Sequence, residues 1–290
     1  MENPENTDAL FLEAVAAIDN GNLNALKELL SKHPHLATTR LSYPTDGYFK
    51  TPYLLWHVAD NPIRIDRLPA NIVEVTRFLV QVIKQQAAAN TQEQLDYTLG
   101  LVATGRIPKE CGVQIEMIDL LIDAGAKPGD GLGAFAHGNI EAAKHLIERG
   151  GELTLAAAVC LERTDDVKKL ASGASENELL TALTAAAFYG KSGMISLLLG
   201  MGINPNGYPK DGTGFHSHAT PLHQAICSGS LDAVKLLVDA GAGLDLKDRI
   251  YDGTPLGWAE HMQTEEGVDD EKKKNFIAIT KYLKEKLSKK

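Results

Sequence analysis

Short runs of apolar residues recur at helical spacing along the chain, separated by glycine or small polar residues. One run forms a single stripe along a helix and consists of Leu231, Val234, Leu237 and Val238. Gly229 precedes this helix and Gly241 follows it, and glycine adopts the left-handed conformation that ends a helix at low cost. Before Gly229, Thr220 can cap another helix whose first residue is Pro221. The pattern predicts a pair of short helices joined by a turn.

The same pattern occurs in several copies. Residues 181–204 align without a gap with residues 220–243, and a third copy begins at Thr254. Weaker copies keep the spacing with fewer marker residues, and they cover about 11–30, 51–80, the residues up to 126, 131–151 and 155–174. Helices this short are not stable alone, so each pair needs neighbours against which to bury its stripe. The repeats therefore predict a solenoid, and about eight units of about 33 residues would fill most of the chain.

Composition and charge exclude several classes of function. The 290 residues include 29 basic and 38 acidic side chains, and the net charge of −9 disfavours binding to a phosphate backbone. Aromatic residues make up 6%, too few for stacking on single strands, and no apolar run is long enough to span a membrane. The polar N-terminus lacks a secretory signal, and three widely spaced cysteines suit a reducing compartment. We expect a cytoplasmic protein that binds neither nucleic acid nor membrane.

The repeats resemble those of the ankyrin-repeat family. The residues that match its signature are Thr220-Pro221-Leu222-His223, Gly229, Leu236-Leu237 and Gly241-Ala242. The resemblance implies an all-α ankyrin-repeat solenoid with β-hairpin-like fingers, formed as a single array of about eight repeats over residues 1–290. It further implies a soluble, monomeric protein of the bacterial type that binds a protein partner, with no enzymatic activity and no cofactor. For His223 it implies a structural role, in which the imidazole ring hydrogen-bonds backbone between repeats.

Three insertions and one terminal helix depart from the repeat. The insertions cover residues 61–70, 105–113 and 206–219. In solenoids such insertions often lie on the binding face, although drift in surface loops explains them equally well. Residues 273–288 are predicted to form a C-terminal capping helix surrounded by lysines. Its apolar face consists of Phe276, Ile279, Leu283 and Leu287.

Ankyrin-repeat proteins bind partners through finger tips and the exposed concave faces of first helices, and the resemblance places the candidate contact residues there. The candidates are Tyr48, Phe49, Lys50, Tyr208, Lys210, Asp211, Phe215, His216, His218, Arg249, Ile250, Tyr251, Asp252 and Trp258. Tryptophan is frequent at binding hot spots, but Trp258 and Trp56 could also fill space between stacked helices. The expected mechanism is recognition by a preformed surface, and the acidic protein favours a partner with a basic patch.

Two other functions stay open at this point. His216 and His218 lie on the long finger at residues 206–219 and have the ligand type of a zinc site, which would make this a metal protein or an enzyme. His223 is near in sequence and Asp211 could reach, but no nearby cysteine offers a fourth ligand, so we expect no metal. Alternatively, the array could be a scaffold or an inhibitor of a separately encoded enzyme.

Overall fold

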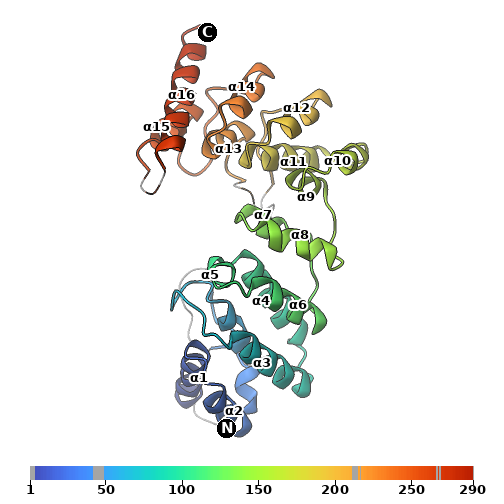
Figure 1. The fold of residues 1–290 in the computed structure, drawn as a ribbon, viewed down its shortest axis with the longest axis vertical. Coiled ribbons are helices and arrows are strands. Elements are labelled where there is room, and N and C mark those ends of the chain that lie inside the picture. The colour runs from blue at the N-terminus through green and yellow to red at the C-terminus, as the bar shows by residue number, and fades with distance from the viewer. Residues whose placement is uncertain are drawn as a thin grey trace. The chain divides into compact units, whose positions relative to one another are not determined.

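The computed structural model describes residues 4–41, 49–210, 215, 217–265, 267 and 269–289. Two compact units divide the chain, Met1–Glu152 and Leu153–Lys290. Over the described residues, both units consist of helices and connecting turns (Figure 1), and the only extended pairing there is one isolated bridge between Arg40 and Tyr53. The all-α class expected from the sequence is therefore confirmed. None of the helices in these ranges is both long and apolar enough to span a membrane.

The first unit is built from helix pairs. One row of mutually contacting helices, the inner row, consists of α1 (Pro4–Asp19), the 3-10 helix η2 (Leu54–Ala59), α4 (Thr91–Thr104) and α7 (Leu132–Ala136). The outer row consists of α2 (Leu23–Lys32), α3 (Ile72–Gln86), α6 (Gln114–Asp123) and α8 (Ile140–Glu148). Two short helices lie in the connections, η1 (Pro34–Ala37) and α5 (Arg106–Glu110).

The second unit repeats this arrangement. Its inner row consists of α9 (Leu155–Cys160), α11 (Glu176–Phe188), α13 (Pro221–Ser228) and α15 (Pro255–His261). Its outer row consists of α10 (Thr164–Ala171), α12 (Ser192–Gly200), α14 (Leu231–Asp239) and α16 (Asp270–Leu287). Each unit thus has four pairs in its described residues. That all pairs form one array of about eight repeats stays a prediction.

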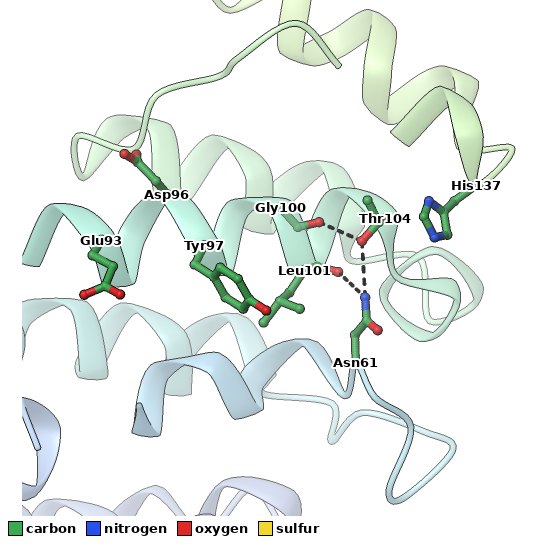
Figure 2. Close-up of a pocket in the computed structure, with 8 residues that line it drawn as sticks. All are labelled: Asn61, Glu93, Asp96, Tyr97, Gly100, Leu101, Thr104 and His137. Carbon is green, nitrogen blue, oxygen red and sulfur yellow. Dashed lines mark hydrogen bonds between the residues drawn. The ribbon is translucent and has the colours of Figure 1, made fainter. Parts of the chain in front are cut away.

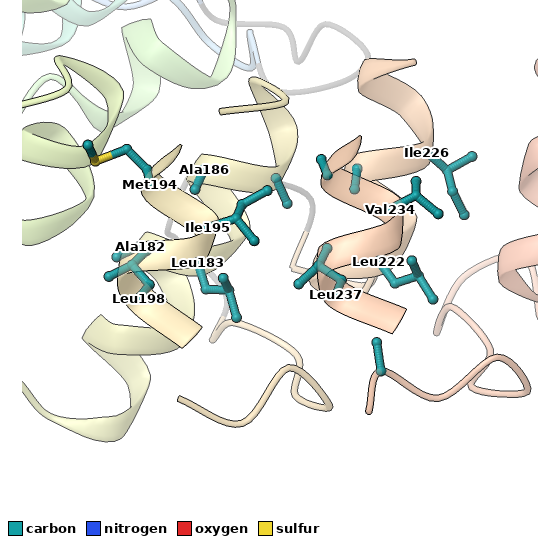
Figure 3. Close-up of a cluster of buried hydrophobic side chains, with 14 of the residues drawn as sticks. Ala182, Leu183, Ala186, Met194, Ile195, Leu198, Leu222, Ile226, Val234 and Leu237 are labelled. Carbon is teal, nitrogen blue, oxygen red and sulfur yellow. The ribbon is translucent and has the colours of Figure 1, made fainter. Parts of the chain in front are cut away.

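The apolar stripes of successive pairs form one core in the second unit. Figure 3 shows Leu183 and Ile195 from one pair, and Leu222 and Leu237 from the next, among the buried side chains. Each of the four is at most 1% exposed. Burial of a leucine or isoleucine side chain stabilises a fold by about 1.5–3 kcal/mol, so the packing of one pair on the next holds these short helices in place.

The C-terminal helix packs as a cap. It begins at Asp270, three residues before the predicted start, because the Asp269 side chain accepts a hydrogen bond from the Lys272 N–H at 2.8 Å and so caps it. Its buried face contains Phe276, Ile279 and Leu283, each at most 1% exposed. The helix contacts α14 and α15, and this contact covers their apolar surface.

The insertion at residues 61–70 is an ordered loop without helix. Asp60 ends η2 in the left-handed conformation and is 1% exposed. Its carboxylate accepts hydrogen bonds from the backbone N–H groups of Arg64 (2.7 Å) and Asp66 (3.1 Å), and Arg64 also pairs with Asp19 at 2.6 Å. One buried acidic side chain therefore fixes the backbone at residues 64–66 of the loop.

The insertion at residues 105–113 contains the short helix α5, where the sequence favoured a loop. Pro108 is tolerated because it is the third residue of α5, in the first turn, where its missing N–H breaks no helical hydrogen bond. Arg106 pairs with Asp66 at 3.1 Å, so this insertion contacts the loop at 61–70.

Candidate functional site

A finger at residues 248–253 is held by one buried carboxylate. Asp248 is 3% exposed. Its Oδ1 accepts hydrogen bonds from the backbone N–H groups of Ile250 (2.9 Å) and Tyr251 (2.7 Å), and its Oδ2 accepts one from Gly253 (2.9 Å). Such bonds fix the backbone of a tight turn without using the side chains at its tip. The tip residues Ile250 and Tyr251 are therefore held in place while their side chains stay exposed.

The same carboxylate joins the finger to α15. The indole Nε1 of Trp258 donates a hydrogen bond to Asp248 Oδ2 at 2.9 Å. Burial by itself would raise the pKa of Asp248, but the hydrogen bonds from the finger N–H groups and from Trp258 outweigh burial and lower the pKa to about 2. Asp248 is therefore ionised at neutral pH, and charge-assisted hydrogen bonds of this kind are stronger than neutral ones.

The finger is also tied to the preceding inner helix. His223 at the start of α13 is fully buried, and its Nδ1 accepts a hydrogen bond from the Thr220 N–H at 3.3 Å. Its Nε2 lies 3.1 Å from the carbonyl oxygen of Gly253 and donates to it, while its ring meets the Trp258 ring edge-on at 4.9 Å. Burial lowers the pKa of His223, which keeps the ring neutral. The structural role expected for His223 is confirmed.

A pocket of about 790 Å³ opens between the finger and α15. Its lining residues are His218, Cys227, Tyr251, Gly253, Gly257, Trp258, His261, Met262 and Glu265. The pocket brings together three residues singled out in the sequence, because the His218 ring lies 5.9 Å from Tyr251 and 6.0 Å from Trp258. Beside it, Tyr251 is 76% and Ile250 63% exposed, the two highest values among the large hydrophobic residues described. We call Ile250, Tyr251 and Trp258 the finger surface.

A second contact links the finger to the 206–219 insertion. The Arg249 guanidinium lies 4.0 Å from the centre of the Tyr208 ring, and the Tyr208 hydroxyl donates a hydrogen bond to the carbonyl oxygen of Lys247 at 2.7 Å. The Arg249 N–H also donates to the carbonyl oxygen of His218 at 2.8 Å. Tyr208 thus contacts the finger at Arg249 and Lys247 and ties it to the insertion at residues 206–219.

The other candidates fall into three groups. Phe49 and Phe215 are 5% and 2% exposed, and their rings pack on His57 and Phe188, so we omit both from the proposed contact surface. The exposed candidates away from the pocket are Lys50, Lys210 and Asp252. The candidates outside the described residues are Tyr48, Asp211 and His216.

The alternative metal site falls largely outside the described residues, since His216 and Asp211 lie there. In the described part of the chain, no three histidine, cysteine or acidic side chains group closely enough to hold a metal ion. His218 faces the pocket beside Tyr251, and His223 is occupied by backbone hydrogen bonds. The zinc hypothesis therefore has no support in the geometry of these two described residues.

The first unit has a pocket of its own, of about 690 Å³, along the exposed face of α4 (Figure 2). Its lining residues are Asn61, Glu93, Asp96, Tyr97, Gly100, Leu101, Thr104 and His137. Sequence reasoning missed this pocket, and it also missed Asp248. The sequence does mark the exposed face of α4 by a stripe of non-apolar residues at helical spacing, namely Glu93, Asp96, Gly100 and Thr104. For Asp248 the signal was an acidic residue directly before a turn that ends in glycine.

One comparison with known proteins matches part of the repeat region. A family model described as ankyrin repeats (3 copies) matches residues 132–248, from α7 to the start of the finger. Among solved structures, the ankyrin repeat domain of human ASB11 is similar at 15% identity and a TM-score of 0.34, covering 78% of this chain and 96% of that one. No curated protein sequence matches the chain. Residues 132–248 are thus similar to ankyrin repeats, and this stretch contains the helix pairs from α7 to α14.

Proposed function

We propose that this protein binds another protein through the finger surface formed by Ile250, Tyr251 and Trp258. The observation that carries the proposal is the exposure of Ile250 (63%) and Tyr251 (76%) on a backbone fixed by Asp248. Covering two adjacent apolar side chains with a partner removes their surface from water and so favours binding. Because the finger is already ordered, binding costs little conformational entropy, and a few aromatic anchors supply most of the affinity.

Net charge and free cysteines bear on the charge of the partner and on the compartment of the protein. The net charge of −9 favours a partner with a basic patch and speeds its encounter at low salt. We propose a cytoplasmic protein, since the free thiols of Cys111, Cys160 and Cys227 suit a reducing compartment. We further propose that it is a monomer without catalytic activity or cofactor. A scaffold or inhibitor of an enzyme would use the same surface in the same way.

A comparison of variants tests this function. Protein bound from a lysate of the source organism is quantified for the wild type, for Tyr251→Ser with Ile250→Ser, and for Ile277→Ser as the control. Ile277 is also an exposed isoleucine, at 56%, but it belongs to α16 and not to the finger. We expect one or more proteins to be depleted at least tenfold in the finger variant and unchanged in the control. Equal capture by all three proteins would contradict the proposal.

A further inference from the structure

The pocket on α4 has a glycine on its floor that the fold does not require. Gly100 lies in the interior of α4, and it is exposed. A Cβ atom built at Gly100 would meet no other atom within 4 Å, whereas one at Gly105 would come within 2.8 Å of the Leu101 carbonyl oxygen. A glycine within a helix is destabilising relative to alanine. Packing therefore explains Gly105 but not Gly100, and what Gly100 provides is open space at the pocket floor.

The wall of this pocket is a fixed aromatic ring. Tyr97 precedes Gly100 by about one helical turn of α4. Its ring stacks on the Trp56 ring, with the centroids 4.0 Å apart and the planes 28° apart. Trp56 is 4% exposed, so Tyr97 rests on a rigid, buried support. Figure 2 shows Tyr97 between Glu93 and Leu101 along the pocket. A flat aromatic surface held in this way is suited to a planar or aliphatic group.

The charge of the pocket is negative. Its described lining contains the carboxylates of Glu93 and Asp96 and no lysine or arginine. Glu93 pairs with Arg40 at the rim. Asp96 accepts hydrogen bonds from the Gln92 side chain at 2.8 Å and from the Lys127 N–H at 2.7 Å, both on Oδ1, and it forms no ion pair with any described residue. One fixed carboxylate thus lies at the pocket without a cationic partner.

The far end of the pocket is lined by Asn61, Thr104 and His137. Asn61 donates hydrogen bonds to the Leu101 carbonyl oxygen at 3.1 Å and to Thr104 Oγ1 at 3.2 Å, and Thr104 donates in turn to the Gly100 carbonyl oxygen at 2.8 Å (Figure 2). The His137 ring donates from Nδ1 to the Gly133 carbonyl oxygen at 2.8 Å. These bonds hold the shape of this end of the pocket.

We propose that the α4 pocket binds the arginine side chain of an extended segment of a partner protein. The guanidinium group is planar and always charged, so it can lie along the Tyr97 ring while its N–H groups face the Asp96 carboxylate. The aliphatic part of the side chain then passes over Gly100 and Leu101, where the absence of a Cβ leaves room for it. A lysine carries the charge but lacks the flat shape, and a neutral side chain lacks the charge.

This site lies in the first unit and uses no residue of the finger surface. It can therefore be right or wrong independently of the function proposed above. The Tyr251→Ser variant serves as the control that separates the two, because it alters the second unit and leaves α4 intact.

The experiment uses three peptides of defined sequence with the full chain. The ¹⁵N-labelled protein is titrated with acetyl-Gly-Arg-Gly-amide, and with the same peptide carrying citrulline or lysine in place of arginine. We expect saturable chemical-shift changes at the amides of Tyr97, Gly100 and Thr104 with the arginine peptide. The lysine peptide should bind at least threefold more weakly, and the citrulline peptide, which has nearly the same shape but no charge, should not saturate.

Two variants locate the binding. Asp96→Asn removes the negative charge, and Gly100→Leu fills the space above residue 100. Each substitution should weaken binding of the arginine peptide at least tenfold. Gly193→Leu is the matched control, since Gly193 is an exposed helical glycine of α12 with equally open surroundings. It should bind like the wild type, as should Tyr251→Ser. The proposal would be overturned if the citrulline peptide saturated the protein or if the lysine peptide bound as tightly as the arginine peptide. It would also be overturned if the chemical-shift changes lay away from α4 or if Gly100→Leu bound the arginine peptide like the wild type.

Discussion

The indole Nε1 of Trp258 and the buried carboxylate of Asp248 form a hydrogen bond of 2.9 Å that joins an exposed finger to the helix behind it. Asp248 also accepts three backbone hydrogen bonds from the finger. One side chain therefore determines both the conformation of residues 249–253 and the orientation of Trp258. The finger surface is preformed because these four bonds share a single acceptor group.

The first prediction concerns this carboxylate. Asp248→Asn should lower the free energy of unfolding by about 2–3 kcal/mol, because an amide nitrogen replaces one acceptor oxygen and leaves buried donors unsatisfied. Urea unfolding followed by circular dichroism measures the change. Asp252→Asn is the control on the same finger, since Asp252 is exposed and forms its one ion pair among the described residues with Lys247. This substitution should cost less than about 0.5 kcal/mol. Equal losses in the two variants would refute the role of Asp248.

The second prediction concerns pH. Burial, together with the charge of Arg64, lowers the pKa of His57 from 6.5 to about 3. The unfolded chain then binds a proton below pH 6.5 that the folded chain does not bind, so stability falls as the pH drops from 6.5 towards 3. Between pH 7 and pH 5 this group should cost about 2 kcal/mol.

The His57→Asn variant isolates this effect. Its amide nitrogen can still donate to the Tyr53 carbonyl oxygen, which His57 Nδ1 contacts at 3.2 Å, but it does not titrate. Urea unfolding at pH 5, 6 and 7 should show a weaker dependence on pH than in the wild type. If both proteins lost the same stability between pH 7 and 5, His57 would not be the group responsible.

The third prediction concerns the C-terminal cap. Phe276→Ala should destabilise the protein by about 3–5 kcal/mol, because the removed ring is 1% exposed and leaves a cavity against α14 and α15. The neighbouring Ile277→Ala removes a side chain that is 56% exposed and should change stability by less than about 0.5 kcal/mol. Thermal unfolding of both variants tests the role of α16, and a Phe276→Ala protein as stable as the wild type would exclude it.

The fourth prediction concerns Gly100 and stability alone. Gly100→Ala should stabilise the protein by about 0.5–1 kcal/mol, because alanine favours the helix and its Cβ meets no neighbour. Differential scanning calorimetry measures the gain. A destabilised Gly100→Ala protein would show that the fold itself needs this glycine, contrary to the structure.

The sequence predicted the helices best where local signals agreed with packing. Thr220 and Pro221 mark the start of α13, and Gly229 ends it in the left-handed conformation. The capping helix was also expected, with a start three residues too late because the capping role of Asp269 was overlooked. Such signals lie within a few residues of the structure that they determine.

The features missed depend on contacts between distant residues. Phe215 lies in a glycine-rich loop, where aromatic side chains are usually exposed, yet it packs on the Phe188 ring at 5.5 Å. The α4 pocket is closed by Asn61, forty residues from Leu101 in sequence. The turn after Asp248 could be recognised from the sequence, but its hydrogen bond with Trp258, ten residues further along the chain, could not. Spacing along one helix carries no information about such contacts.

The central claim is that the finger surface binds a protein, and photo-crosslinking tests it most directly. A benzophenone amino acid replaces Tyr251 in one protein and Ile277 in another, and both are irradiated in a lysate of the source organism before quantitative mass spectrometry. The account predicts a protein crosslinked at position 251, absent at position 277, and lost when Trp258→Ala is added to the first. Identical crosslinked proteins at both positions, or crosslinking at 251 that Trp258→Ala leaves unchanged, would contradict it.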